Sequence, residues 1–254
     1  MQVVVYALEN GAALIKRAAY RNATAPIDLA IAGSTIAVTD LMKSLSLITY
    51  TPGSAGLPDA LTEVARHFET LWGTACAQVS ANTYLQADAE GNLVVLEHDV
   101  QGFSEEDRRR LRVTSEMLLG EMVNRIRPVT VVPTASAAVV PKAFLATVEG
   151  GVYLYADIAP QYRDLLIRLQ ARMVEVIKSA GDVPFGRYRG VRTQVRDMGE
   201  EGPVRFVDGE VVEGFLDLDE EGQGRVCEGL PGVREGLEGV EMVKGVVEGL
   251  RRVR

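Results

Sequence analysis

The sequence predicts a mainly β fold with an α-helical carboxy-terminal domain, in which a partial β-propeller precedes a small group of helices. Three observations lead to this fold class. Apolar residues alternate with period two through about residue 158, three hairpin-like stretches resemble one another, and the apolar period becomes helical after Pro160. The 254 residues are enough for two domains, which we expect at residues 1–158 and 159–254.

Eight strands are expected in the first part, from runs rich in Val, Leu, Ile, Ala and Thr that are separated by turn residues. They are residues 2–8, 35–39, 44–50, 76–80, 83–87, 93–98, 143–147 and 152–156.

Three hairpins, at residues 36–50, 84–98 and 144–156, look like copies of one another. Ser44 and Asn92 are 48 positions apart, and Asn92 and Gly151 are 59 positions apart across a charged insert at 104–112. A hairpin that recurs at roughly 40–50 residues is typical of propeller blades, and three unrelated hairpins in one sandwich are the alternative. We expect three to four blades, fewer than most closed propellers have, and therefore edges that the missing strands of a larger ring would cover.

The change of period falls within residues 146–183. Apolar residues alternate on both sides of the Gly-rich turn at 149–151, which predicts a hairpin. Pro160 then suits the first turn of a helix, because its missing N–H is not needed there. The apolar residues that follow recur at helical spacing up to the expected stop at Gly181, and they are Tyr162, Leu165, Leu166, Leu169, Met173, Val176 and Ile177.

Two more helical segments are expected after a polar connection at 185–204. Asp208 is a suitable N-cap for a helix that carries Val211, Val212, Phe215 and Leu216 on one face. The last segment carries Val240, Val243, Val246, Val247 and Leu250, and the Gly-rich residues 229–239 before it are expected to be partly loop.

Composition excludes several classes of protein. No apolar run reaches the roughly 18 residues that a membrane span needs, and the first residues lack the pattern of a secretory signal. Two cysteines far apart in sequence, Cys76 and Cys227, fit a reducing compartment. The net charge of −8 argues against a general nucleic-acid binder. We therefore expect no membrane partner and no direct binding of nucleic acid.

The sequence also predicts no enzyme, no metal site and no cofactor. No nucleophile, base and orienting group combine in a motif, and His67 and His98 lack further ligands at metal-binding spacing. Residues 217–228 approach the outline of a calcium loop, but a solvated acidic helix start explains them equally. Arg108–Arg110 follow three acidic residues and are interpreted as part of a self-neutralised surface loop.

Six motifs are specific in combination, because they occur in one order and spacing along nearly the whole chain. They lie at residues 38–50, 63–72, 118–126, 144–154, 165–183 and 206–218. Together they resemble the carboxy-terminal part of the large subunit of the UV-damaged-DNA-binding protein, the adaptor of cullin-4 ubiquitin ligases. More distantly, the same region is similar to the large cleavage-and-polyadenylation-specificity subunit and its splicing-factor paralogue.

The resemblance implies a fold of three β-propellers with a helical carboxy-terminal domain, of which this chain would be the later blades of the third propeller and the whole helical domain. In that family, the cleft between the first and third propellers binds a short helix of interchangeable substrate receptors. The second propeller holds the cullin, so we do not expect this chain alone to bind cullin. The resemblance also implies the rest of the propeller scaffold as a partner, and a location in nucleus and cytoplasm.

The positions that face the receptor carry over by motif, and they are Leu41, Lys43, Trp72, Met122, Asn124 and Val148. The resemblance places Leu41 and Lys43 in the first hairpin turn, Trp72 at the end of the following strand and Val148 in the last hairpin. Apolar and aromatic walls with a few polar groups are typical of a groove that binds a helix. Lys43 stands where the family commonly has Arg, and Met122 where it has Phe, so receptor preference is expected to differ.

Three functions follow from these observations. The first is a protein-interaction scaffold of the adaptor branch, without chemistry of its own. The second is a subunit of the RNA-processing branch that acts as an assembly scaffold in an RNA-binding complex. The third is a calcium-responsive module built on residues 217–228.

Overall fold

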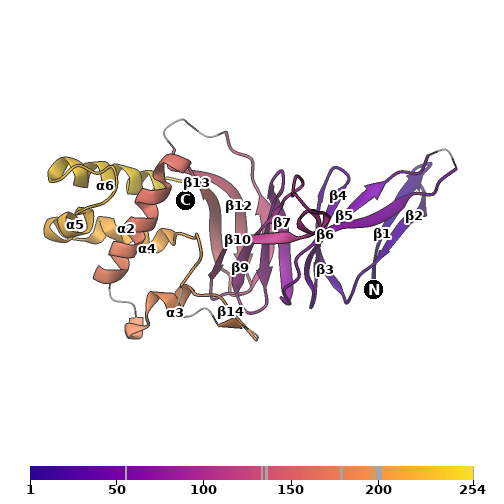
Figure 1. The fold of residues 1–254 in the computed structure, drawn as a ribbon, viewed down its shortest axis with the longest axis horizontal. Helices are drawn as coiled ribbons and strands as arrows, with labels where there is room; N and C mark the ends of the chain where they lie inside the picture. Colours follow the sequence, from indigo (N-terminus) through magenta and orange to yellow (C-terminus); the bar gives the residue numbers. More distant parts are fainter. Residues whose placement is uncertain are drawn as a thin grey trace.

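The computed structural model describes residues 1–54, 56–132, 134, 137–177, 180–194, 196–197 and 202–253. The molecule is elongated, with a β-hairpin at one end, upright sheets in the middle and helices at the other end (Figure 1). The predicted fold class, partial propeller blades followed by helices, is confirmed. Within the described residues, no helix has the length and apolar character to cross a membrane.

Three antiparallel sheets stand side by side as blades, and a hairpin precedes them. The hairpin consists of β1 (Gln2–Glu9) and β2 (Ala13–Arg21). The first blade contains β3 (Pro26–Ala32), β4 (Thr35–Asp40), β5 (Ser44–Thr51) and β6 (Ala60–Arg66). The second blade contains β7 (Gly73–Ser80), β8 (Thr83–Asp88), β9 (Asn92–His98) and β10 (Leu111–Leu118). The third blade contains β11 (Val123–Pro128), β12 (Val139–Thr147) and β13 (Val152–Ile158).

The three similar hairpins are the second and third strands of the three blades. They form the pairs β4–β5, β8–β9 and β12–β13, and all eight expected strands are present with slightly wider bounds. Within the first hairpin and the blades, the strands that the sequence did not predict are β2, β3, β6, β10 and β11. In each blade, therefore, the periodicity identified the second and third strands and missed the first strand, the fourth strand or both.

Apolar side chains fill the space between neighbouring blades. Leu45, Leu47, Leu85 and Leu96 are among the most buried side chains, and they belong to the clusters between the first and second and between the second and third blades. In the first two blades, β4, β5, β8 and β9 are buried on both faces, whereas β13 of the third blade has no buried residue.

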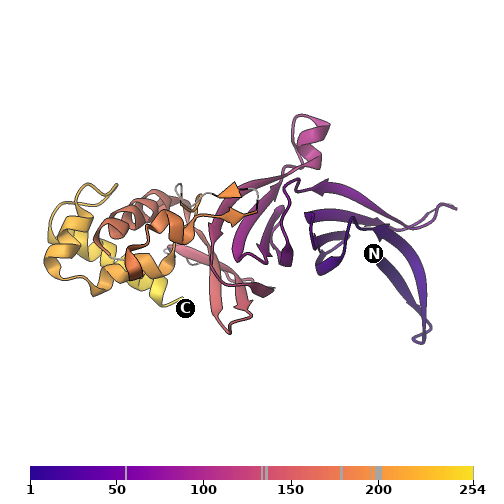
Figure 2. The ribbon, with the colours of Figure 1, turned by 90° about the horizontal axis from the view of Figure 1, so that it is seen from below.

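The charged insert between β9 and β10 forms a short helix, α1 (Glu105–Arg109), that projects from the blades (Figure 2). Ser104 and Asp107 cap it reciprocally, and Arg109 pairs with Glu105 at 2.9 Å. Arg110 lies over the ring of Phe68. The insert thus neutralises much of its own charge, as the sequence indicated.

The helical part packs around one apolar cluster that includes Leu169, Met173, Phe215 and Val243. Its longer helices are α2 (Arg163–Val176), α5 (Glu220–Cys227) and α6 (Leu237–Arg251). Its shorter elements are η1 (Pro160–Tyr162), η2 (Ala180–Asp182), α3 (Phe185–Arg189), α4 (Gly209–Glu213) and η3 (Gly214–Asp217), with the small strands β14 (Arg192–Thr193) and β15 (Arg196–Asp197).

One expectation for the helical part is wrong. The helix after Pro160 ends at Val176, because Ile177 is already extended, and Gly181 instead lies in η2 with a φ of 73°. The polar connection at 185–204 contains α3, β14 and β15. The expected cap at Asp208 is confirmed, since its side chain accepts from the N–H of Glu210.

The acidic stretch at 217–228 forms the end of η3 and the helix α5. The side chain of Asp219 accepts from the N–H of Gly222 and so caps that helix. Among the residues that the structure describes, no three His, Cys, Asp or Glu side chains gather so as to hold a metal ion. A capped helix start accounts for these acidic residues.

Candidate protein-docking surface

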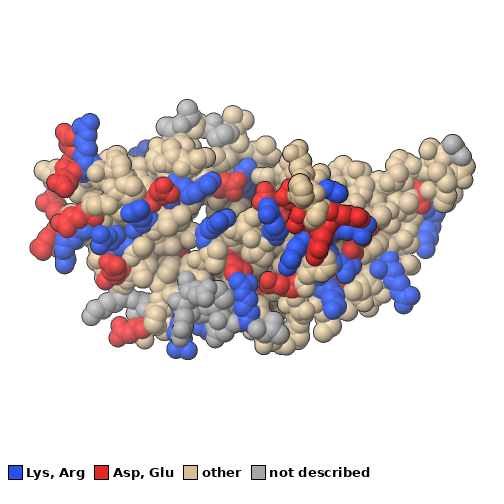
Figure 3. All heavy atoms as spheres, viewed as in Figure 1, with Lys and Arg blue, Asp and Glu red and all other residues tan. Residues whose placement is uncertain are grey.

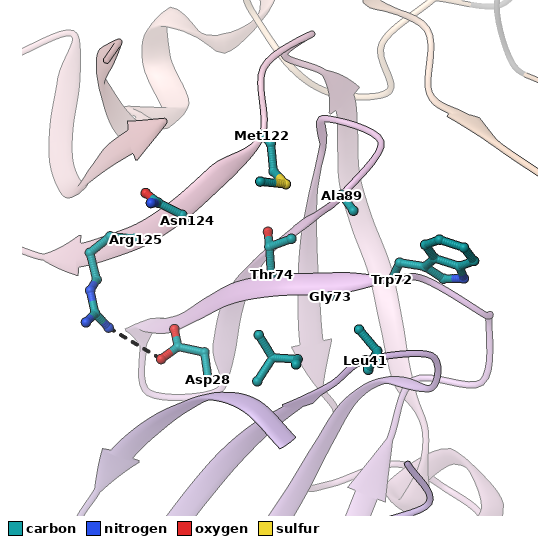
Figure 4. Close-up of a pocket in the computed structure, with 10 residues that line it drawn as sticks. Asp28, Leu41, Trp72, Gly73, Thr74, Ala89, Met122, Asn124 and Arg125 are labelled. Atoms are coloured by element: carbon teal, nitrogen blue, oxygen red, sulfur yellow. Dashed lines mark ion pairs between the residues drawn. The ribbon is translucent and has the colours of Figure 1, made fainter. Parts of the chain in front are cut away.

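A shallow hollow of about 410 Å³ opens where the loops at one end of the three blades meet (Figure 4). Four of the six residues expected to face a receptor line it, and they are Leu41, Trp72, Met122 and Asn124. They come from the β4–β5 turn, the β6–β7 connection, the β10–β11 connection and β11. The structure thus brings together side chains that are up to 83 positions apart in the sequence.

The other two expected residues lie beside the hollow and do not line it. The N–H of Val148 donates to the carbonyl oxygen of Met122 at 3.0 Å, which ties the β12–β13 turn to the β10–β11 connection. Lys43 is exposed in the same turn as Leu41. All six side chains therefore belong to loops or strand ends on one face of the blades, and their contact with a partner stays a prediction.

Asp40 builds the turn that presents Leu41 and Lys43. Its buried carboxylate accepts hydrogen bonds from Thr24 and from the N–H groups of Met42 and Lys43, the last two at 3.1 Å. Burial opposes ionisation of this carboxyl group, but the hydrogen bonds outweigh it and hold the pKa of Asp40 below its usual value. A charged, fully bonded side chain thus fixes the turn.

The resemblance implied that Trp72 ends a strand. In the structure it lies in the connection between β6 and β7. Its side chain is 42% exposed, whereas the neighbouring Leu71 is buried in the core between blades. Gly73 follows, and a Cβ there would come within 2.1 Å of the Thr39 side chain. The close approach of β7 to β4 therefore requires glycine and sets Trp72 at the edge of the hollow.

Apart from Asn124, the sequence did not identify the polar residues of the hollow. Asp28 and Arg125 form an ion pair at 3.5 Å across it, and Asp28 also accepts from the N–H of Cys76 at 3.1 Å (Figure 4). Thr74 donates its hydroxyl to the carbonyl oxygen of Val123 at 2.6 Å and so ties β7 to β11. Asp28 lies on β3 and Arg125 on β11, two strands that the sequence did not predict.

A serine–histidine pair lies nearby, but it is inside the core. Ser44 Oγ is 2.8 Å from His67 Nδ1 and donates to Gln86 Oε1 at 2.9 Å. Ser44 is fully buried and His67 is 4% exposed, so a substrate carbonyl has no access to the hydroxyl. The pair joins the first blade to the second, and we assign it a structural role.

A protein-family model for the CPSF A subunit region matches residues 1–217. This chain belongs to that family. The match covers every blade and ends at the last residue of η3, so the CPSF A subunit region includes the hollow and the segment that connects the blades to the helices.

Curated proteins of similar sequence are named DNA damage-binding protein 1 or 1a. The chain is 28% identical over 258 residues to DNA damage-binding protein 1 of Schizosaccharomyces pombe, covering 99% of this chain and 22% of the relative. It is 32% identical over 189 residues to DNA damage-binding protein 1a of Arabidopsis thaliana, covering 73% and 17%. It is 27% identical over 241 residues to DNA damage-binding protein 1 of Drosophila melanogaster, covering 92% and 20%. The chain spans about a fifth of the length of these relatives.

Proposed function

We propose that this chain is a non-enzymatic protein-interaction scaffold that docks a short amphipathic helix of a substrate-receptor protein for ubiquitination in the DNA-damage response. The similarity to proteins named DNA damage-binding protein 1 supports this role. The feature that carries the proposal is the hollow, where Leu41, Trp72 and Met122 supply apolar and aromatic surface and Asn124 supplies a polar group. Such a surface suits the apolar face of a helix.

The remaining parts of the proposal follow from the same family. Residues 1–158 form the blade domain, which joins the rest of a larger propeller, and residues 159–254 form the helical domain. We expect this chain to act in nucleus and cytoplasm and not to bind cullin by itself. Acidic and basic side chains are interspersed over the face shown in Figure 3, which supports a protein partner over direct contact with nucleic acid.

The alternative is a scaffold in an RNA-processing complex for cleavage and polyadenylation or splicing. The observation that favours it is the family itself, because the matching model describes the CPSF A subunit region. Both functions use the blades as a protein-binding platform, so they differ in the partner and not in the kind of site.

Affinity capture with three baits tests the proposal. Trp72→Asp places a carboxylate in the hollow, whereas Phe103→Asp makes the same change at an aromatic side chain that is fully exposed and lies in the β9–β10 connection before α1. We expect the wild-type chain and F103D to capture substrate receptors, and W72D to lose them while it remains folded. Capture of polyadenylation or splicing subunits supports the alternative, and retention of receptors by W72D contradicts docking at the hollow.

Direct binding is measurable with a peptide. A fluorescein-labelled peptide that comprises the docking helix of a captured receptor serves as the probe. Trp72 is the single tryptophan of the chain, so its fluorescence reports on the hollow without background. We expect the unlabelled peptide to shift the Trp72 emission to shorter wavelength, because the indole leaves water.

A further inference from the structure

A buried arginine of the helical part contacts a loop of the docking surface. Arg189 ends α3, and its Nη1 donates to the carbonyl oxygens of Leu119 at 2.8 Å and Leu118 at 3.4 Å. These carbonyls belong to the end of β10 and to the connection that leads to Met122. Arg189 therefore reaches from the helical part to the base of a loop that lines the hollow.

The guanidinium group is held on its other side as well. Its Nε donates to Asp208 Oδ2 at 2.6 Å, and the guanidinium carbon lies 4.2 Å from the centre of the Tyr188 ring. Arg189 is 5% exposed and the side chain of Asp208 is similarly buried. A planar guanidinium has separate donors for the carboxylate and for the carbonyls, whereas a lysine ammonium is a single point that cannot bridge them in the same way.

Asp208 belongs to the framework of the helical part. Its Oδ1 accepts from the N–H of Glu210 and caps α4, and its own N–H donates to Gln170 Oε1 of α2 at 2.6 Å. The ion pair thus connects Arg189 to two helices. A displacement of those helices would therefore be transmitted to the carbonyls of Leu118 and Leu119.

The same segment holds a second loop of the docking surface. Asn92 donates its side-chain amide to the carbonyl oxygen of Arg192 at 2.7 Å, and the N–H of Arg192 donates back to Asn92 Oδ1 at 3.1 Å. The carbonyl oxygen of Gly91 accepts from the N–H groups of Leu119 and Gly120, at 2.9 and 3.2 Å. The β8–β9 turn and the β10–β11 connection are thus joined to each other and to residues 189–192.

We propose that Arg189 is a positioning residue for the docking surface, which holds the β10–β11 connection against the helical part so that Met122 faces the hollow. The inference rests on the proposed docking function. It adds that the affinity for the docking helix depends on a residue that does not touch it. The state of the helical part and the shape of the hollow are then coupled through the Arg189–Asp208 pair.

Hydrogen exchange and peptide binding test this coupling in the full chain. Arg189→Met removes the bridge, and Arg189→Lys keeps the charge without the two-sided geometry. R189M leaves the buried Asp208 carboxylate without its cation, which can unfold the chain. The double variant R189M/D208N removes that unpaired charge and is used if R189M does not fold. Val243→Ala is the matched control, since Val243 is buried in the helical core but belongs to α6, which has no part in the bridge.

We expect amide exchange at Leu119 and Gly120 to be at least ten times faster in R189M or the double variant, and affinity for the labelled peptide to fall about tenfold. R189K should lie between these variants and the wild type, and V243A should leave both quantities unchanged despite a lower melting temperature. Unchanged exchange or unchanged affinity in a folded Arg189 variant overturns the inference, as does the same response in V243A. If the wild-type chain binds no docking peptide, the proposed function fails, and the exchange result alone decides whether Arg189 positions the connection.

Discussion

The N–H of Val148 donates to the carbonyl oxygen of Met122, and this bond recurs in all three blades. In the second blade Ala89 donates to Trp72 at 2.8 Å, and in the first blade Leu41 donates to Ala25 at 2.8 Å. In each case the first residue of the turn between the second and third strands bonds to the residue just before the blade's first strand. Four of the six expected docking residues therefore occupy two structurally equivalent positions, which loops of unrelated hairpins would not share.

The small side chain of Ala89 leaves space for the hollow at the second blade. The equivalent positions in the neighbouring blades carry the larger side chains Leu41 and Val148, whereas Ala89 lines the hollow with one methyl group. We predict that Ala89→Leu fills the hollow and lowers the affinity for the docking peptide at least tenfold. Because residue 89 is exposed, the free energy of unfolding should change by less than about 0.5 kcal/mol.

Fluorescence anisotropy of the labelled peptide measures this loss, and urea unfolding measures the stability. Ala81→Leu is the control, because it makes the same change at an exposed position between β7 and β8 that does not line the hollow. A89L that binds as tightly as the wild type would show that the partner does not enter the hollow.

A second prediction concerns the turn that Asp40 fixes. Asp40→Ala leaves the N–H groups of Met42 and Lys43 without their acceptor, and such a loss costs about 1–3 kcal/mol of unfolding free energy. We expect weaker docking as well, since Leu41 is then no longer held in place. Asp88 accepts from the N–H groups of Glu90 and Asn92 in the second blade, so D88A is expected to loosen that turn in the same way.

The contribution of Asp40 also depends on pH. Its folded-state pKa lies below its unfolded value, so its stabilisation is complete above the unfolded pKa of about 3.9 and is lost as the pH falls through the folded value. Between pH 7 and pH 5 the difference in unfolding free energy between wild type and D40A should therefore stay constant. A difference that already shrinks in this range would contradict the ionised, fully bonded carboxylate.

How much the sequence predicts depends on how many faces of an element are buried. The strands β4, β5, β8 and β9 are buried on both faces and are rich in apolar residues, so they were found, as were the apolar face of α2 and the cap at Asp208. The strand β11 has two buried residues, Val123 and Ile126, among exposed polar ones, and it was missed. The buried residues of β11 do not alternate with period two, so its sequence gives no strand signal.

The docking residues were placed by resemblance and not by periodicity. Nothing local in the sequence connects Asp28 with Arg125, or Arg189 with Leu119, because these pairs form only when distant segments pack. Trp72 was expected to end the strand after the first hairpin, but β6 already ends at Arg66 and Trp72 lies in the connection that follows.

The third prediction concerns His67, whose pKa is lowered mainly by burial. Arg110 and Arg196 lower it further, and Glu69 opposes them. His67 is therefore neutral in the folded chain, while in the unfolded chain it takes up a proton as the pH falls through about 6.5. The contribution of neutral His67 to the unfolding free energy is complete above the unfolded-state pKa of about 6.5. It is lost as the pH falls toward the folded-state pKa, by at most about 1.4 kcal/mol per pH unit.

Urea unfolding of the wild type and of His67→Gln at pH 7.5 and pH 5.5 measures this share. We expect the unfolding free energy of the wild type to fall more steeply between these pH values than that of H67Q, because only the wild type must exclude a proton from the space beside Ser44. His98→Gln removes the other histidine, which is hydrogen-bonded to the carbonyl oxygen of Arg108 in the insert, and should keep the steep wild-type dependence. Equal slopes for the wild type and H67Q would mean that His67 is protonated within the folded blades, and the contact between the first two blades would then need a buried counter-charge.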